Sequence, residues 1–235
     1  MLIHKIYTLF LLVLVICSCE NERENLFSRT SLLKHEINNL DSISYYISQG
    51  YDGVEFDLHI SDTSLLVYYD DPQKANLFAD YLNFMKRNPN NLFWIGLKTF
   101  TKGGLVSFCR TMPAMPNCFI ETNVEEVVDF LSVKGYNLIY TIRHVSDWNE
   151  SDSLCLKQEI DHAIQRYPIK GLTSNYIMYF HMRSAYSSFS KYIWHCVPEN
   201  TNNILVTKQI LGDPSVTVLL LDYKNVYYLK NEKNN

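Results

Sequence analysis

The chain has 235 residues, 47% of them hydrophobic, and a net charge of −4 at neutral pH. Removal of the segment before Cys19 would take away one positive charge, that of Lys5, and leave about 215 residues with a charge near −5. A chain of this length can form one large domain. Its mild acidity and the lack of a basic block in the sequence exclude the usual electrostatic signature of nucleic-acid binding.

The N-terminal segment has the pattern of a signal peptide. Lys5 precedes an apolar run, Ile6–Ile16, that is too short to span a bilayer as a helix. The next residues complete the sequence Ile-Cys-Ser-Cys, which resembles the lipobox of bacterial lipoproteins and places the lipid on Cys19. We therefore expect a lipoprotein signal peptide over residues 1–18 and a polar tether over residues 19–30. An ordinary cleaved signal peptide or a short anchor helix is the alternative.

Strand-like and helix-like segments alternate along the rest of the chain. In chain order, the patterns predict strand Leu32–Ile37, helix Asp41–Ser48, strands Gly53–Ile60 and Leu65–Tyr69, helix Lys74–Arg87, strand Leu92–Thr99, helix Gly104–Met112, strand Cys118–Thr122, helix Val124–Val133, strand Tyr136–Arg143, helix Leu156–Tyr167, strand Ile169–Thr173, helix Tyr179–Phe189, strand Tyr192–Val197, helix Asn203–Leu211 and strand Val216–Leu221.

Eight strands that alternate with helices, with one extra strand at Leu65, predict a parallel sheet with right-handed crossovers. In an α/β domain of this size the pattern favours a small, somewhat distorted (β/α)8 TIM-like barrel over residues 31–229. Residues 230–235 are expected to form a flexible tail. The alternative is an open doubly wound sheet, but no glycine-rich nucleotide-binding motif follows any predicted strand.

Four further cysteines have no metal-binding spacing: Cys109, Cys118, Cys155 and Cys196. The sequence therefore does not predict a zinc site. Cys109 and Cys118 flank a proline-containing loop and are the only plausible near pair for a disulfide. Buried free thiols are the alternative.

The clearest cluster of polar residues lies on the strand Gly53–Ile60. Because strand residues two apart face the same way, Glu55, Asp57 and His59 share one face. Two adjacent carboxylates suit a hard divalent ion such as Ca²⁺ or Mg²⁺. The alternative is an ordinary strand with a solvated polar face.

The order and spacing of several short motifs resemble the glycerophosphodiester phosphodiesterases, within the wider phosphatidylinositol phospholipase C-like superfamily. The His-x-x-Asn form of the first motif is similar to that of the menorin family. The matching segments touch both ends of the domain: His35–Asn38, Gly50–His59, Leu66–Asp70, Ile95–Lys98, Tyr192–Trp194 and Leu219–Tyr223.

This resemblance implies a barrel that hydrolyses a phosphodiester, with histidines as acid–base groups and Ca²⁺ or Mg²⁺ neutralising the phosphate. His35 matches the first catalytic histidine, and Lys98 matches a phosphate-facing lysine. Glu55 and Asp57 match two metal ligands. The phosphodiester or phospholipid head group would be the ligand.

Several positions depart from the family pattern. The arginine expected after the first histidine is Glu36, and the second catalytic histidine is replaced by Tyr69, whose hydroxyl is a weak acid. The third metal ligand is replaced by Gly96, for which Glu121 at the end of the next strand is the candidate substitute. Each lost acid–base group costs about 10²–10⁴ in rate.

Three functions remain open. The first choice is a membrane-anchored barrel that has lost catalysis and binds a ligand or partner. The second is a divalent-metal-dependent phosphodiester hydrolase with altered catalytic groups, and the third is a structural envelope lipoprotein. In each case the lipid would hold the protein in the bacterial cell envelope, at the outer membrane or the periplasmic face.

Overall fold

A computed structural model describes residues 30–143 and 150–231. The predicted signal peptide, the lipid-bearing Cys19 and residues 19–29 of the predicted tether lie outside the described residues. Within the described ranges, no helix has the length and apolar character needed to cross a bilayer.

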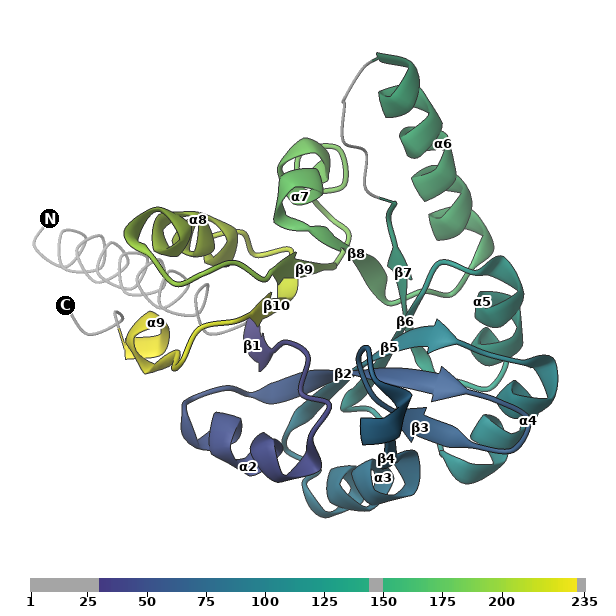
Figure 1. Ribbon diagram of the computed structural model, residues 1–235. Helices are drawn as coiled ribbons and strands as arrows, with labels where there is room; N and C mark the ends of the chain where they lie inside the picture. The colour runs from purple at the N-terminus through teal and green to yellow at the C-terminus, as the bar shows by residue number, and fades with distance from the viewer. Residues whose placement is uncertain (1–29, 144–149, 232–235) are drawn as a thin grey trace, which may run out of the picture.

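Eight parallel strands form a closed barrel, which confirms the predicted TIM-like fold (Figure 1). The barrel closes where the first strand pairs with both the last and the second. The first strand has four residues and meets the second at only two register positions, so this seam is short. The strands are β1 (Ser31–Lys34), β2 (Gly53–Ile60), β5 (Leu92–Thr99), β6 (Cys118–Thr122), β7 (Asn137–Thr141), β8 (Gly171–Asn175), β9 (Lys191–His195) and β10 (Val216–Leu221).

Helices surround the barrel and cover the outer face of its strands (Figure 1). In α3, the apolar residues Phe78, Tyr81, Leu82 and Met85 recur every three or four positions and are all buried, as an amphipathic helix requires. The helices are α2 (Leu40–Ser48), α3 (Phe78–Arg87), α4 (Lys102–Thr111), α5 (Glu125–Ser132), α6 (Glu150–Arg166), α7 (Tyr176–Met182), α8 (Thr201–Leu211) and α9 (Tyr227–Asn231).

The inside of the barrel has its own core. Six buried residues from five strands fill it: Leu33, Trp94, Ile139, Tyr192, Val218 and Leu220. Trp94 and Tyr192 meet edge to face with ring centroids 5.8 Å apart. Because inward and outward residues alternate, Glu55 and Asp57 face this interior while Val54, Phe56 and Leu58 belong to the outer core.

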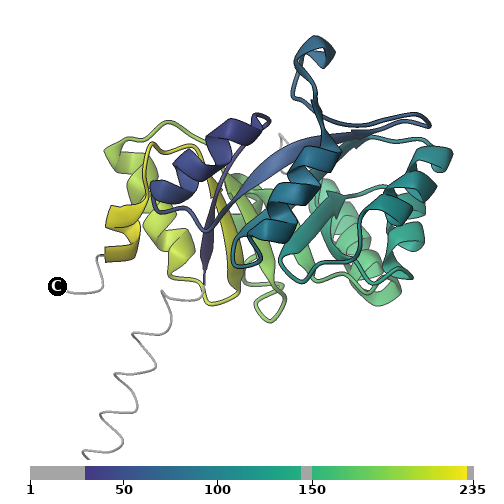
Figure 2. The ribbon, with the colours of Figure 1, turned by 90° about the horizontal axis from the view of Figure 1, so that it is seen from below.

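An arm of antiparallel strands extends the sheet beyond β2. It consists of β3 (Leu65–Val67), a 3₁₀ turn η1 (Pro72–Lys74) and β4 (Asn76–Leu77), and Figure 2 shows it projecting from the barrel. The predicted helix Lys74–Arg87 therefore begins later, at Phe78, because Asn76 and Leu77 pair with β3.

Other boundaries also differ from the sequence patterns, for example α6, which begins at Glu150 where the pattern predicts Leu156. The first strand ends at Lys34, and Glu36 adopts a positive φ of 54° that no strand can contain. The helix predicted over Tyr179–Phe189 lies earlier, at Tyr176–Met182, because Asn175 caps it by accepting the N–H of Met178. At the C-terminus, α9 includes Lys230, the first residue of the predicted tail.

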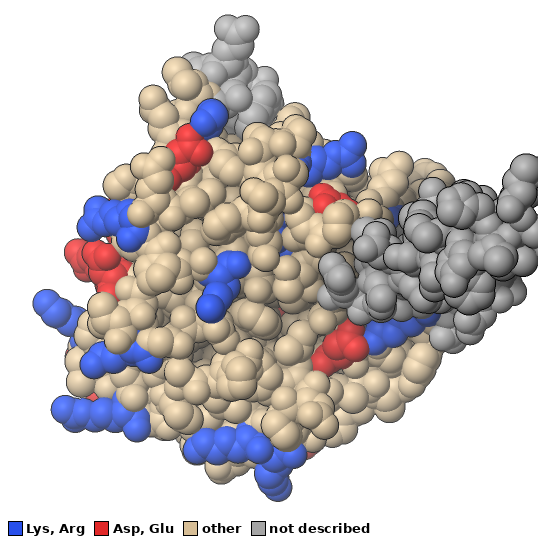
Figure 3. All heavy atoms as spheres, turned by 180° about the vertical axis from the view of Figure 1, so that it is seen from behind, with Lys and Arg blue, Asp and Glu red and all other residues tan. Residues whose placement is uncertain are grey.

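Charged residues are dispersed over the surface. Figure 3 shows the face opposite to that of Figure 1, where lysine and arginine side chains are spread among uncharged residues and mostly along the rim. This distribution agrees with the absence of a basic block in the sequence.

Candidate functional site at the barrel mouth

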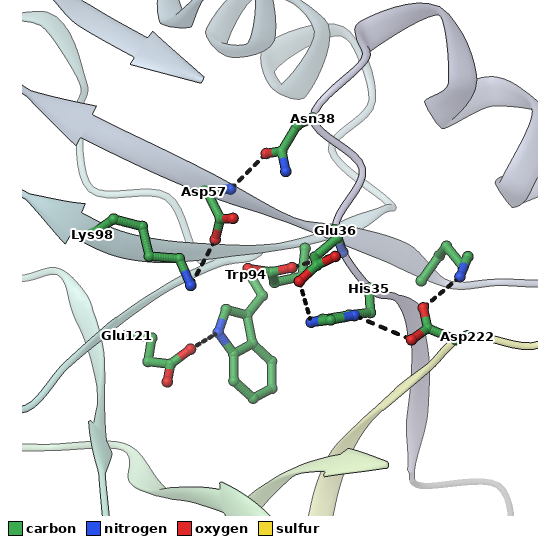
Figure 4. A network of polar contacts seen from close by, with 10 residues as sticks. His35, Glu36, Asn38, Asp57, Trp94, Lys98, Glu121 and Asp222 are labelled. Atoms are coloured by element: carbon green, nitrogen blue, oxygen red, sulfur yellow. Dashed lines mark hydrogen bonds and ion pairs between the residues drawn. The ribbon is translucent and has the colours of Figure 1, made fainter. Parts of the chain in front are cut away.

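The carboxyl ends of the strands bring most of the predicted site residues together (Figure 4). Glu55 and Asp57 come from β2, Lys98 from β5 and Glu121 from β6, while His35 directly follows β1. Asp222, a strand-end residue of β10, joins them beside His35.

Glu55 and Asp57 form a buried carboxylate pair. Glu55 is 3% exposed and Asp57 is 1% exposed. The backbone N–H of Glu36 donates to Glu55 Oε2 at 2.8 Å, and Asn38 Oδ1 accepts the backbone N–H of Asp57 at 2.8 Å. Burial and the neighbouring charge of Asp57 raise the pKa of Glu55 to about 8.

Lys98 supplies the positive charge nearest to this pair. Its Nζ lies 2.8 Å from Asp57 Oδ1, and about half of its side chain is exposed at the mouth. Burial opposes the charged form of Lys98, but the contact with Asp57 outweighs it and raises the lysine pKa. The other oxygen of Asp57, Oδ2, has no hydrogen-bond partner among the described residues.

Gly96 lies between the two carboxylates, at the position of the missing third ligand. A Cβ on Gly96 would lie 3.0 Å from Glu55 Oε1 and 3.1 Å from Asp57 Oδ1. The carboxylates thus occupy the space that a longer side chain would need. Two carboxylates, one of them paired with Lys98, do not fit a cation site built from three acidic side chains.

Glu121 faces the barrel interior and makes two hydrogen bonds there. Trp94 Nε1 donates to its Oε2 at 2.7 Å, and Thr141 Oγ1 donates to its Oε1 at 2.8 Å. Burial raises the pKa of Glu121, while these two donors act in the opposite direction. Both oxygens are used in holding Trp94 and Thr141, so the metal role suggested for Glu121 has no support in this geometry.

His35 lies between two carboxylates. Its Nδ1 is 3.3 Å from Asp222 Oδ2, and its Nε2 is 3.4 Å from Glu36 Oε1. Burial opposes protonation of the ring, but Asp222, the Cys196 thiol and the charge of Glu55 together raise the pKa of His35 to about 11. Hydrogen bonds from His35 and Lys34 lower the pKa of Asp222 despite its partial burial.

Tyr69 lies apart from this network, on the segment between β3 and η1. Its side chain is 54% exposed. The neighbouring Tyr68 stacks on His59, with ring centroids 3.7 Å apart, and His59 Nδ1 contacts Thr99 Oγ1 at 3.1 Å. Burial lowers the pKa of His59. His59 therefore packs against the arm, whereas Tyr69 makes no ring contact with another described residue and is largely exposed.

A cavity of about 710 Å³ separates the arm from the loop that follows β1. Asn38 and Asn76 lie at this junction, where Asn76 Nδ2 donates to the Asn38 carbonyl at 2.8 Å. The charged and aromatic lining comprises four carboxylates, one lysine and two tyrosines: Glu36, Asp41, Asp70, Asp71, Lys74, Tyr68 and Tyr69.

Cys196 is the mouth residue that the motif spacing missed. Its neighbour His195 is fully buried on the outer side of the barrel, with Nε2 3.1 Å from the Asn203 carbonyl. Cys196 points the opposite way, toward His35, as the alternation of strand residues requires. The described cysteines are all free thiols, and the disulfide considered between Cys109 and Cys118 is absent.

No protein-family model matches the chain, and no curated protein matches it by sequence. Solved structures do resemble it. A glycerophosphodiester phosphodiesterase from Parabacteroides distasonis has a TM-score of 0.62 at 15% identity, over 87% of this chain and 97% of that one. The corresponding enzyme from Thermotoga maritima has a TM-score of 0.58 at 13% identity, over 85% and 97%.

A solved structure that is not a glycerophosphodiester phosphodiesterase also resembles this chain. DHPS from Yersinia pestis has a TM-score of 0.52 at 8% identity, over 87% of this chain and 92% of that one. A shared barrel therefore leaves the chemistry open. At these identities the comparisons establish the fold alone, a TIM-like barrel similar to that of the glycerophosphodiester phosphodiesterases.

Proposed function

We propose that the protein is a lipid-anchored component of the bacterial cell envelope whose phosphodiesterase-like barrel binds a phosphodiester head group without hydrolysing it at an enzymatic rate. The observation that carries this proposal is the pairing of Lys98 with Asp57 beside Gly96. Lys98 pairs with the carboxylate of Asp57, which metal-dependent hydrolysis would need as part of a complete cation site.

The acid–base machinery is also incomplete. His35 is held between Asp222 and Glu36, and Tyr69 is an exposed side chain on the arm. Two-step phosphodiester hydrolysis needs one group to accept a proton and another to donate one. Loss of one such group costs about 10²–10⁴ in rate, which removes useful turnover while leaving binding intact.

The charges around the mouth indicate a zwitterionic ligand. Lys98, about half exposed at the mouth, presents positive charge to a phosphate. The adjacent cavity has the opposite character, since its carboxylates outnumber its single lysine and two tyrosine rings line it. Carboxylates and aromatic faces stabilise an ammonium group. Zwitterionic phospholipid head groups are diesters that join a phosphate to an amine or ammonium group. Such a ligand matches both the positive charge at the mouth and the acidic, aromatic cavity beside it.

Isothermal calorimetry with glycerophosphoethanolamine, in the presence of a chelator, tests this proposal. We expect binding that is tighter than that of glycerol 3-phosphate, and Lys98→Ala should weaken it at least tenfold. Lys102→Ala, an exposed lysine nearby in the chain, is the matched control and should have no effect. If neither glycerophosphoethanolamine nor glycerol 3-phosphate binds, the result would favour the structural-lipoprotein alternative.

A divalent-metal hydrolase is the second candidate, and the unpartnered Asp57 Oδ2 favours it. A buried carboxylate oxygen without a donor could face a Mg²⁺ ion, which binds through one or two carboxylates and retains water, or Ca²⁺. Calorimetry with each ion tests for binding that Asp57→Asn removes. Hydrolysis of a glycerophosphodiester that depends on such an ion and is abolished by His35→Ala would replace the binding proposal.

The membrane anchor is tested separately. Metabolic labelling of cells with a palmitate analogue should label the wild-type protein and leave Cys19→Ala unlabelled. The variant should also move from the membrane fraction to the soluble fraction. Labelling that persists in Cys19→Ala would refute the lipid site.

A further inference from the structure

We propose that His35, Cys196 and Asp222 form a binding site for a transition-metal dication of the zinc type, separate from the Glu55–Asp57 pair. The three residues follow β1, β9 and β10, three adjacent strands at the seam where the barrel closes. This proposal does not rest on the head-group binding proposed above.

The distances are compatible with one ion. One ligand atom from each residue lies within 4.8 Å of the other two. Zinc bonds of about 2.0–2.3 Å place tetrahedral ligands about 3.3–3.8 Å apart. His35 Nδ1 and Asp222 Oδ2 are already 3.3 Å apart, which is the spacing of two ligands on one zinc ion, and the Cys196 ligand atom lies within 4.8 Å of the other two residues' ligand atoms.

The donor set selects the class of metal. A thiolate, an imidazole nitrogen and a carboxylate oxygen together suit zinc and cobalt, whereas Ca²⁺ and Mg²⁺ prefer oxygen ligands alone. Binding releases two protons to solvent, the thiol proton of Cys196 and one ring proton of His35, because the ligands are a thiolate and a neutral imidazole. Three protein ligands leave a fourth position for water or for a bound anion.

The surrounding contacts favour the same atoms. Metal-bound histidines generally donate a hydrogen bond from their second ring nitrogen to a carboxylate. In this protein Glu36 Oε1 lies 3.4 Å from His35 Nε2. Ligating carboxylates are themselves hydrogen-bonded, and Lys34 Nζ donates to Asp222 Oδ1 at 2.7 Å. Because Glu36 lies at Nε2 and Lys34 at Oδ1, the atoms left to bind an ion together with Cys196 are His35 Nδ1 and Asp222 Oδ2.

Glu36 reaches His35 through an unusual backbone conformation. Its φ of 54° is in the left-handed region, and Glu55 stabilises it by accepting the Glu36 N–H. Such conformations are strained and persist where the surroundings enforce them. Glu36, at the position where the family pattern has an arginine, thus places a carboxylate beside the ring of His35.

The test uses the full-length protein in detergent, stripped of metal with a chelator and titrated with Zn²⁺ against a chromogenic indicator. We expect one equivalent to bind. With Co²⁺ as the probe, we expect the near-ultraviolet charge-transfer band of a cobalt–thiolate bond. Cys196→Ser should remove the band and weaken zinc binding at least tenfold, whereas Cys155→Ser, which removes an exposed thiol, should change neither.

Two further variants distinguish zinc bound at His35 from zinc bound at the Glu55–Asp57 pair. Glu36→Ala should weaken zinc binding about 10- to 100-fold through the second ring nitrogen of His35. Lys98→Ala should leave zinc binding unchanged, although it is expected to weaken head-group binding. Zinc binding that is absent in the wild type, or retained in a folded Cys196→Ser variant checked by circular dichroism, would overturn the proposal.

Discussion

Trp94 fills the centre of the barrel on the strand that also carries Gly96 and Lys98. Its indole nitrogen donates to Glu121, and this contact turns a residue that resembles a metal ligand into an acceptor within the barrel. His35 shows the same dependence on neighbours, since Asp222 and Glu36 hold its two ring nitrogens. At the scale of single residues, side-chain partners decide the chemistry more than residue identity does.

Trp94→Phe should destabilise the protein by about 1–3 kcal/mol, because the partly buried carboxylate of Glu121 would lose a donor inside the barrel. Urea unfolding followed by circular dichroism measures the loss. Trp194→Phe, at a half-buried position, is the control and should cost less. An equal loss in both variants would contradict the role assigned to the Trp94–Glu121 hydrogen bond.

The pH dependence of stability tests the carboxylate pair. Burial, followed by the charge of Asp57, raises the pKa of Glu55 from 4.5 to about 8 in the folded protein. A raised folded pKa stabilises the fold below pH 4.5, and this contribution disappears as the pH rises through 8. Glu55→Gln should therefore become progressively more stable than the wild type between these two pH values.

Chemical denaturation in chelator-containing buffers gives both stability curves. His35, with its pKa raised from 6.5 to about 11, should add a loss of stability between those values in both proteins. The difference between the curves reports the ionisation of Glu55 together with its effect on His35, whose pKa the charge of Glu55 helps to raise. A constant difference across the window from pH 4.5 to 8 would show that Glu55 ionises normally in the fold.

At the scale of elements, β2 and β5 position the site. They are the longest strands of the barrel, with eight residues each, and together they carry Glu55, Asp57, Gly96 and Lys98. Their pairing begins at Gly53 opposite Leu92. The backbones approach closely there, because a Cβ on Gly53 would lie only 1.8 Å from the Leu92 carbonyl oxygen.

Gly53→Ala should destabilise the protein by about 3 kcal/mol or more, since the added methyl group overlaps backbone rather than a movable side chain. Gly212→Ala is the matched control, because the nearest atom to its added Cβ would be 3.5 Å away. Urea midpoints compare the two variants. A Gly53→Ala midpoint equal to that of the control would mean that β2 and β5 can separate at this end.

At the scale of the whole molecule, the barrel depends on a short seam. Four-residue β1 joins β10 to β2, and the Lys34–Asp222 ion pair lies at the carboxyl end of this seam. The same seam carries His35 and adjoins Cys196. The strand pairings that close the barrel therefore also bring the residues of the proposed metal site together.

Asp222→Asn should lower the free energy of unfolding by about 2–3 kcal/mol, because Lys34 is nearly buried and would lose its charged partner. The unfolding transition should remain single, since the seam belongs to the one core. Lys230→Ala, which breaks the more exposed Lys230–Asp52 pair, should cost less than about 1 kcal/mol. A second transition in Asp222→Asn would show that the seam opens independently.

Local patterns in the sequence determined the fold class. Alternation with period two marks the barrel strands, and helical spacing marks most of the helices between them, since both patterns record which side of an element is buried. The same alternation placed Glu55 and Asp57 on one face. Boundaries were less accurate where tertiary contacts intervene, as at Phe78, where α3 begins after two residues pair with the arm.

Only the tertiary structure decided which side chains meet at the mouth. From the sequence, Glu121 is a candidate metal ligand and Lys98 a candidate phosphate-facing lysine, yet Glu121 accepts a hydrogen bond from Trp94 and Lys98 pairs with Asp57. Cys196 and His35 lie at opposite ends of the domain sequence and have no common motif spacing. They meet because a closed barrel places its first strand, β1, beside its last, β10, and β10 in turn pairs with β9, which Cys196 follows; this is a property of the whole sheet and not of any segment.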